Sequence, residues 1–180
     1  MRAGRRRLPV SLVCILFAVC LLSGCVSGSE AANVTEQEAD QIAVGDVELE
    51  VEQIEYGAQV EPPEPIGYYN YYPEREGCHY LIVSGTARNL GDTDFDPESC
   101  YVEVAADGNV REGKIEFTTG RFAEFTDMLS VHKEGVTWKF YLFALMKEDE
   151  EADTISIFYN DDFSSPGEDE PWDQEIRISL

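Results

Sequence analysis

The densest group of side chains that could bind a metal ion lies in the acidic segment "DTDFDPESCYVE", residues 92–103. Asp92, Asp94 and Asp96 alternate along it, and Ca²⁺ prefers oxygen ligands of this kind. The spacing matches part of an EF-hand loop, but Pro97 stands where an EF-hand has glycine, and strand-like segments flank it in place of helices. The segment is therefore either a Ca²⁺ site in a loop or an acidic strand edge that discourages pairing with other chains.

Two cysteines, Cys78 and Cys100, lie in the body of the chain. An even pair outside the cytosol can form a disulfide. Each begins a strand-like segment, however, and a straight strand after Cys78 would carry the chain about 30 Å away, beyond the reach of a disulfide. Only a loop through residues 90–99 that doubles back would join the thiols, so the pair is a candidate disulfide with both outcomes open.

The chain lacks the residue patterns of the common enzyme classes. Its only imidazoles are His79 and His132, with no second histidine at ligand spacing. It has no Gly-rich phosphate loop, nucleophile elbow or HExxH motif. Paired carboxylates are expected by chance among 36 Asp and Glu residues. We therefore expect no enzymatic activity, no catalytic residue and no cofactor.

The N-terminus has the composition of a targeting segment. Four arginines within residues 2–7 precede an apolar run at residues 10–22, which is too short for a comfortable membrane span. The run ends in "LSGC", residues 22–25, which resembles the lipobox of bacterial lipoproteins. The resemblance implies a signal peptide at residues 1–24, a diacylglyceryl group on Cys25, and anchoring on the extracytoplasmic side of the cell membrane. The alternative is an ordinary signal peptide with a coincidental cysteine.

The remainder divides into a linker and one domain. Residues 25–45 are polar, small and weakly periodic, which predicts a flexible linker after the lipidated cysteine. Residues 46–180 are enough for one domain with a real core. No internal repeat is visible.

The domain shows the period-two pattern of β-strands. "VELEVEQIEY" alternates apolar residues with glutamates until Gln53, where a shift of phase predicts a bulge. Asp107-Gly108 predicts a tight hairpin turn. In all we expect about seven strands in a sandwich or barrel, without a helix. The expected core residues are Val83, Val104, Trp138, Leu142, Ile155 and Ile178.

Several longer stretches resemble one class of domain. "GCHYLIVSGTARNLG", the "ADG" hairpin, "LSVHKEGVTWKFYLFALMKEDEE" and "TISIFYND" are similar to immunoglobulin-like domains of unknown function on Gram-positive cell-surface lipoproteins. The resemblance implies an all-β, immunoglobulin-like antiparallel sandwich on the outer face of a membrane. It departs from that class in having "MKED" where a "VP" turn is usual, and in its two cysteines. It implies no catalytic or binding residues.

The run "GYYNYYP" places four tyrosines within residues 68–72. In an extended chain, Tyr69 and Tyr71 point to one side and Tyr68 and Tyr72 to the other. One pair is expected to pack on the sandwich, which leaves Tyr69 and Tyr71 as a candidate partner surface. The alternative is a plain edge strand that leads into residue 78.

The charge and the anchor together favour a binding function. The formal net charge is −23, and all 36 acidic residues lie after Cys25. So acidic a surface argues against nucleic acid and against contact with anionic lipid. We therefore expect a lipid-anchored module at the cell envelope with an unknown protein partner. The alternatives are an envelope-maintenance lipoprotein without a discrete ligand, and a Ca²⁺-dependent adhesion-type module.

Overall fold

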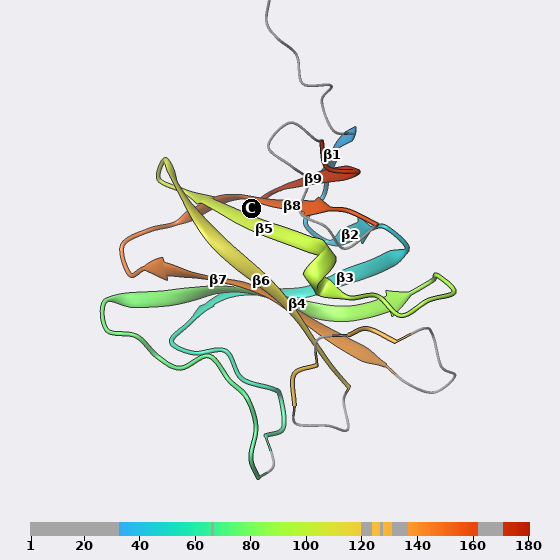
Figure 1. Ribbon diagram of the computed structural model, residues 1–180. Helices are drawn as coiled ribbons and strands as arrows, with labels where there is room; N and C mark the ends of the chain where they lie inside the picture. The colour runs from blue at the N-terminus through green and yellow to red at the C-terminus, as the bar shows by residue number, and fades with distance from the viewer. Residues whose placement is uncertain (1–32, 66, 120–123, 127, 131–136, 162–170) are drawn as a thin grey trace, which may run out of the picture.

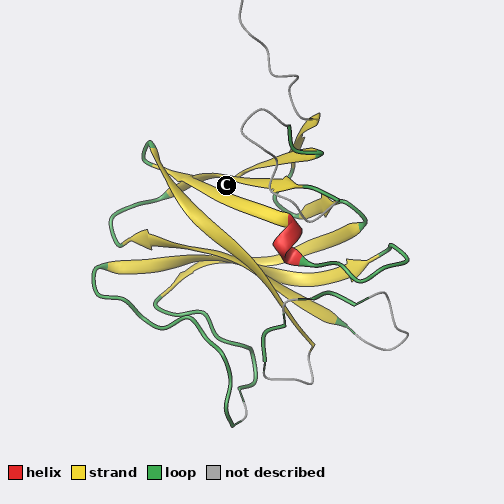
Figure 2. Ribbon diagram, viewed as in Figure 1, coloured by secondary structure: helices red, strands yellow, loops and turns green. Residues whose placement is uncertain are grey.

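The computed structural model describes residues 33–65, 67–119, 124–126, 128–130, 137–161 and 171–180, and in these parts the chain is all-β (Figures 1 and 2). The strands are β1 (Asn33–Gln37), β2 (Gln41–Val44), β3 (Val47–Gly57), β4 (Cys78–Asn89), β5 (Cys100–Ala106), β6 (Asn109–Thr119), β7 (Trp138–Lys147), β8 (Ala152–Tyr159) and β9 (Gln174–Ser179). A short 3-10 turn, Pro97–Ser99, precedes β5. No helix within these residues has the length and apolar character needed to span a membrane.

The nine strands form one continuous sheet in the order β1-β9-β8-β5-β6-β7-β4-β3-β2. Every pairing is antiparallel except that of β1 with β9. The sheet folds over into two layers, one containing β9, β8 and β5 and the other containing β7, β4 and β3 (Figure 1). The all-β sandwich predicted from the sequence is confirmed, with nine strands in place of about seven.

Strand β6 connects the two layers because it changes partner along its length. Its first half pairs with β5 as far as Gly113 opposite Val102, and from Gly113 opposite Ala144 onward it pairs with β7. A Cβ atom at Gly113 would lie 2.7 Å from Val102 Cγ1 and 3.2 Å from the Phe143 carbonyl oxygen. Glycine is therefore required where the strand leaves one layer for the other.

A bulge in β3 confirms the phase shift expected from the sequence. The register with β4 slips between Val51 and Gln53, so that Val51 lies opposite Gly85 and Glu52 has no Cα partner in β4. A Cβ atom at Gly85 would lie 1.9 Å from the Glu50 carbonyl oxygen. The hairpin at Asp107-Gly108 also has the predicted geometry, with positive φ at both residues.

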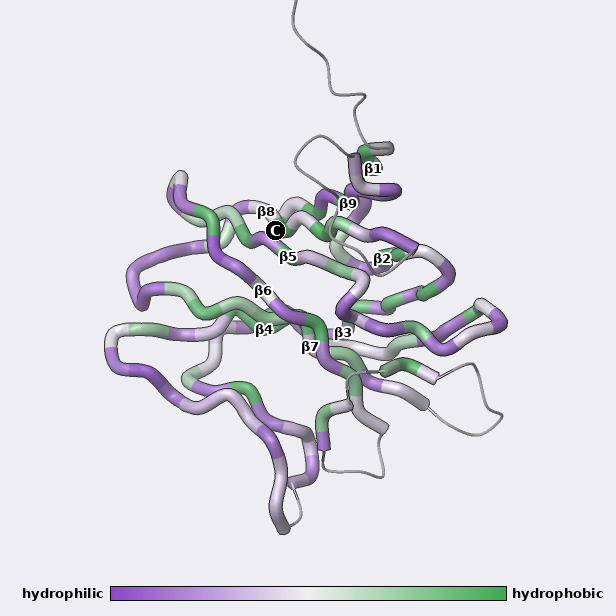
Figure 3. Tube along the Cα trace, in the orientation of Figure 1, coloured by the Kyte–Doolittle hydropathy of each residue, from purple (hydrophilic) through white to green (hydrophobic). Residues whose placement is uncertain are grey.

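The core lies between the layers, and the alternation of hydropathy along the strands is visible in Figure 3. Five of the six expected core residues are buried: Val83, Val104, Leu142, Ile155 and Ile178. The sixth, Trp138, is only partly buried against the core, because it begins β7 at the rim of the sheet. A second, smaller cluster covers the opposite face of β4 and β7, with Val60, Tyr80, Ile82 and Phe143 at its centre.

The predicted linker boundary is wrong, because β1 and β2 fall within residues 25–45 and form the two ends of the sheet. Glutamine side chains join these ends. The Gln37 amide donates to the Ala43 carbonyl oxygen (3.2 Å) and accepts from Ala43 N–H (2.7 Å). Gln174 Oε1 accepts from Gly45 N–H (3.0 Å). Side-chain hydrogen bonds thus join the two ends of the sheet in place of backbone pairing. The polar sequence of β1 hides it from a hydrophobicity pattern, whereas β2 was missed because it is short.

The close approach at Gly85 gives a stability prediction. Gly85→Ala should lower the free energy of unfolding by about 3 kcal/mol, because the new methyl group meets a backbone oxygen that is fixed by the bulge. Urea titration would measure the loss. Ser84→Ala in the same strand is the control and should change the free energy by less than about 0.5 kcal/mol. Equal midpoints for Gly85→Ala and the unmodified chain would contradict the bulge geometry.

Candidate binding site at the tyrosine-rich loop

The long connection between β3 and β4, residues 58–77, packs on the outer face of the β4–β7 layer through Val60 and Tyr72, and its described residues between these two project away from the sheet (Figure 1). Val60 and Tyr72 form an isolated antiparallel bridge, with N–O distances of 3.0 and 2.8 Å, that closes the loop on itself. The extended edge strand considered for residues 68–72 is reduced to this one bridge. We call residues 58–77 the tyrosine-rich loop.

Tyr72 anchors this loop to the sheet. Its ring centroid lies 4.4 Å from that of Phe143 and 6.1 Å from that of Phe125, within the second apolar cluster. Its hydroxyl donates a hydrogen bond to Glu116 Oε1 on β6. The Lys114 ammonium lies 5.7 Å from the ring centroid, in cation–π range. One aromatic side chain therefore combines apolar burial with polar contacts.

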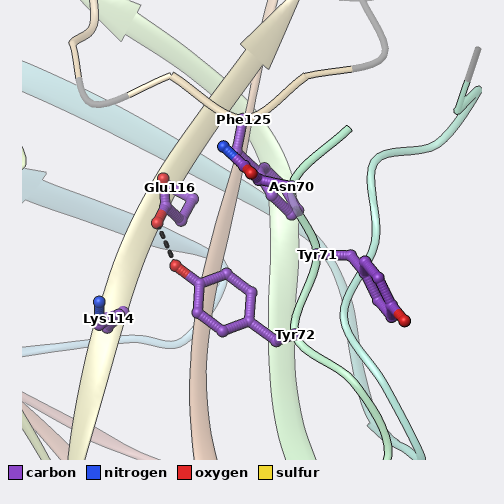
Figure 4. A pocket seen from close by; sticks show the side chains of 6 residues that line it. All are labelled: Asn70, Tyr71, Tyr72, Lys114, Glu116 and Phe125. Carbon is purple, nitrogen blue, oxygen red and sulfur yellow. Dashed lines mark hydrogen bonds between the residues drawn. The ribbon is translucent and has the colours of Figure 1, made fainter. Parts of the chain in front are cut away.

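A pocket of about 350 Å³ opens beside this anchor. Its lining residues come from the loop, from β6 and from the segment 124–126: Asn70, Tyr71, Tyr72, Lys114, Glu116 and Phe125. Figure 4 shows Tyr72, Glu116, Lys114, Asn70 and Phe125 on the pocket side, while the ring of Tyr71 points away across the loop. No local sequence pattern identifies Lys114, Glu116 or Phe125, because only the fold brings them to the tyrosines.

The remaining tyrosines face outward. Tyr71 is 47% exposed, and its ring centroid lies 5.8 Å from that of half-buried Tyr69. The two side chains predicted to share a side are thus in contact. Tyr68 and Tyr72 do not both pack on the sandwich as expected, since Tyr68 is fully exposed and only Tyr72 packs. The loop turns away from the sheet after Val60, which leaves Tyr68 without a surface to cover.

The candidate disulfide does not form, because Cys78 and Cys100 are both free. Cys78 pairs with Lys147 at the end of β7, and Cys100 pairs with Tyr159 at the far end of β8. The length of β8, roughly 25 Å, separates these two ends. Burial raises the pKa of the Cys100 thiol to about 12, so this thiol is unreactive.

The acidic segment is built as a turn. Asp96 caps the 3-10 turn, with its Oδ1 accepting from Glu98 N–H at 2.8 Å. The neighbouring residue, Phe95, forms a backbone bridge with Leu129 and packs against the core. Asp92, Asp94 and Asp96 are not brought together as a metal-binding group, and no such group of three or more ligands occurs elsewhere in the described parts of the chain.

A charged network at the β7–β8 turn was not identified from the sequence, where "KEDEEAD" indicates only a charged turn. Glu150 is 5% exposed and receives two hydrogen bonds from the Arg111 guanidinium, one of them 2.9 Å long from Nε. Lys147 N–H also donates to it at 3.0 Å. The Arg111 hydrogen bonds lower the pKa of Glu150 to about 2.

Three aromatic residues, Tyr101, Phe158 and Trp172, form a separate group on the outer face of the other layer. The Tyr101 and Trp172 rings are nearly parallel, with centroids 6.4 Å apart. Phe158 lies 5.8 Å from Trp172. Tyr101 is 39% exposed. This group supplies matched positions with which to test the tyrosine-rich loop.

Comparison with known proteins supports the fold alone. No family model matches the chain, and no curated protein does. An uncharacterized β-sandwich protein from Clostridium difficile 630 superposes with a TM-score of 0.56 at 14% identity, covering 84% of this chain and 97% of that protein. A protein of Bacillus subtilis described as a lipoprotein, ycdA, reaches a TM-score of only 0.37 at 8% identity, over 78% of this chain and 38% of that protein. A TM-score this low does not indicate a shared fold. The signal peptide and lipidation site expected at residues 1–25 lie outside the described residues and stay predictions.

The anchoring role of Tyr72 predicts a change in protease sensitivity. Tyr72→Ala should expose the loop to trypsin at Arg75, the only lysine or arginine within residues 58–77. Cleavage there should become about tenfold faster, which corresponds to a loss of about 1.4 kcal/mol of docking energy. Tyr68→Ala removes a fully exposed ring and should leave the rate unchanged. Equal rates for the two variants would show that Tyr72 does not hold the loop.

The low pKa of Glu150 predicts an acid-dependent loss of stability. Its contribution is complete above the ordinary carboxyl pKa of 4.5 and is lost as the pH falls towards about 2, because protonation removes the charge that Arg111 binds. Glu150→Gln should therefore be less stable than the unmodified chain at neutral pH, and the difference should shrink over that pH range. Urea midpoints across the range would measure it. A constant difference would contradict the assigned pKa.

Proposed function

We propose that this chain is a non-catalytic, lipid-anchored binding module on the extracytoplasmic side of the cell membrane. The lipobox resemblance at residues 22–25 supports Cys25 as the lipidation site. With β1 beginning at Asn33, residues 26–32 are the tether. Seven residues reach at most about 25 Å when fully extended, so the sheet stays close to the membrane.

The position of the tyrosine-rich loop carries this proposal. The chain enters the sheet at β1, at one end of the molecule, and the loop projects from the opposite end (Figure 1). An anchor upstream of β1 therefore leaves the loop pointing away from the membrane. Its exposed Tyr68 and Tyr71, with half-buried Tyr69 in contact with Tyr71, are then available to a partner.

The chemistry of the loop fits a protein partner. Tyrosine supplies a large contact area with a polar tip at low cost in side-chain entropy, and it is enriched at protein interfaces. Because Tyr72 holds the base of the loop on the sheet, part of the conformational entropy of the loop is already lost before a partner binds. The net charge of −23 disfavours nucleic acid and anionic lipid as partners.

The experiment begins with Cys25→Ala, which should release the protein from the membrane fraction into the soluble fraction. The released protein, fluorescently labelled, is then titrated onto envelopes from cells that lack it. Binding should saturate. The double variant Tyr69→Ala/Tyr71→Ala should weaken it by about tenfold or more, as the loss of central interface residues does.

Tyr101→Ala is the matched control, because it removes an exposed tyrosine from the other layer and should leave binding unchanged. Retention of the Cys25→Ala protein in the membrane would refute the lipid anchor. Binding that never saturates would favour the alternative of an envelope-maintenance protein without a discrete ligand.

A further inference from the structure

We infer that the pocket beside Tyr72 binds a neutral saccharide. The site borders the outward-facing tyrosines, because Tyr71 lies at its edge although its ring points away across the loop (Figure 4). It deepens the proposed function by adding a small-molecule ligand at the same end of the module. At about 350 Å³ it falls at the lower end of the size range of small-molecule sites, which suits a mono- or disaccharide.

The walls of the pocket combine apolar and polar groups as a sugar does. Phe125 and Tyr72, with ring centroids 6.1 Å apart and tilted by 50°, supply aromatic surface for the C–H face of a pyranose ring. Both rings are only half-buried, so part of that surface is accessible. Asn70, Lys114 and Glu116 supply amide, ammonium and carboxylate groups that can donate to and accept from sugar hydroxyls.

The charges of the lining favour a ligand without net charge. Lys114 and Glu116 stand two positions apart on the same face of β6, and their charges cancel. A cationic ligand would meet the Lys114 ammonium, which already lies 5.7 Å from the Tyr72 ring centroid. An anionic ligand would meet the field of a chain with net charge −23. An uncharged polyol avoids both kinds of repulsion, and its hydroxyl groups can form hydrogen bonds with the amide, ammonium and carboxylate groups of the pocket.

The anchoring of Tyr72 keeps the site preformed. Its hydroxyl donates to Glu116, and its ring packs on Phe143, so neither the ring nor the carboxylate must be ordered when a ligand arrives. Weak ligands such as small sugars depend on this, because they bury too little surface to offset the cost of ordering a loop.

The test uses the full chain carrying Cys25→Ala and three neutral probes: the disaccharide of N-acetylglucosamine, maltose and cellobiose. Glucosamine and glucuronic acid are the charged probes. Saturation-transfer NMR and calorimetric titration should detect binding of at least one neutral probe, and weaker binding of both charged ones. Phe125→Ala should weaken the neutral probe by about tenfold, because it removes an aromatic wall, and Asn70→Ala should weaken it as well.

Phe158→Ala is the matched control, since it removes a half-buried phenylalanine from the aromatic group of the other layer and should leave sugar binding unchanged. If Phe125→Ala disturbs the fold, Asn70→Ala carries the test, because Asn70 is exposed. No binding of any neutral probe, equal binding of the charged probes, or unchanged binding in Asn70→Ala would overturn the inference. None of these outcomes changes the envelope titration of the Tyr69→Ala/Tyr71→Ala variant, so the two proposals fail separately.

Discussion

The passage of β6 from one layer to the other is the constraint on which the rest of the structure depends. Because Gly113 pairs with both Val102 and Ala144, the strand closes one side of the sandwich without a loop. Beyond that point β5 and β6 diverge, and a pocket of about 220 Å³ opens between them. The same divergence leaves the outer face of β6 uncovered at Lys114 and Glu116. Tyr72 of the tyrosine-rich loop contacts both of these side chains.

This arrangement makes β4 and β7 apolar on both faces, which a strand with one solvent-facing side does not need. Phe143 pairs with Lys114 of β6 and faces Tyr72, while its neighbours Leu142 and Ala144 point into the main core. The loop therefore covers apolar surface that would otherwise be exposed. This need for cover explains why Tyr72 packs on the sheet while Tyr68 and Tyr71 stay exposed.

Short-range patterns were readable from the sequence, whereas contacts between distant segments were not. The bulge at Gln53 was predicted because the alternation of apolar residues shifts phase there, and the Asp107-Gly108 turn because these residues tolerate positive φ. Strand β1 was missed because four of its five residues are polar, and β2 because it is only four residues long, although its Ile42 and Val44 are buried in the core. The pocket combines residues 70–72 with Lys114, Glu116 and Phe125, whose association follows from the crossing of β6 and leaves no local pattern.

For the lipid-anchored module proposed above, the start of the domain at β1 also bears on its orientation at the membrane. If residues 26–32 are the whole tether, many of the 36 carboxylates lie near the membrane. At physiological salt a carboxylate interacts strongly only with lipid headgroups within about 8 Å. Anionic headgroups would then repel the sides of the sandwich more than its entry point at β1. Repulsion from the membrane surface and a short tether both favour an orientation in which β1 faces the membrane and the rest of the domain points away from it. Such a domain holds the tyrosine-rich loop, at the end opposite to β1, as far from the lipid as the chain allows (Figure 1).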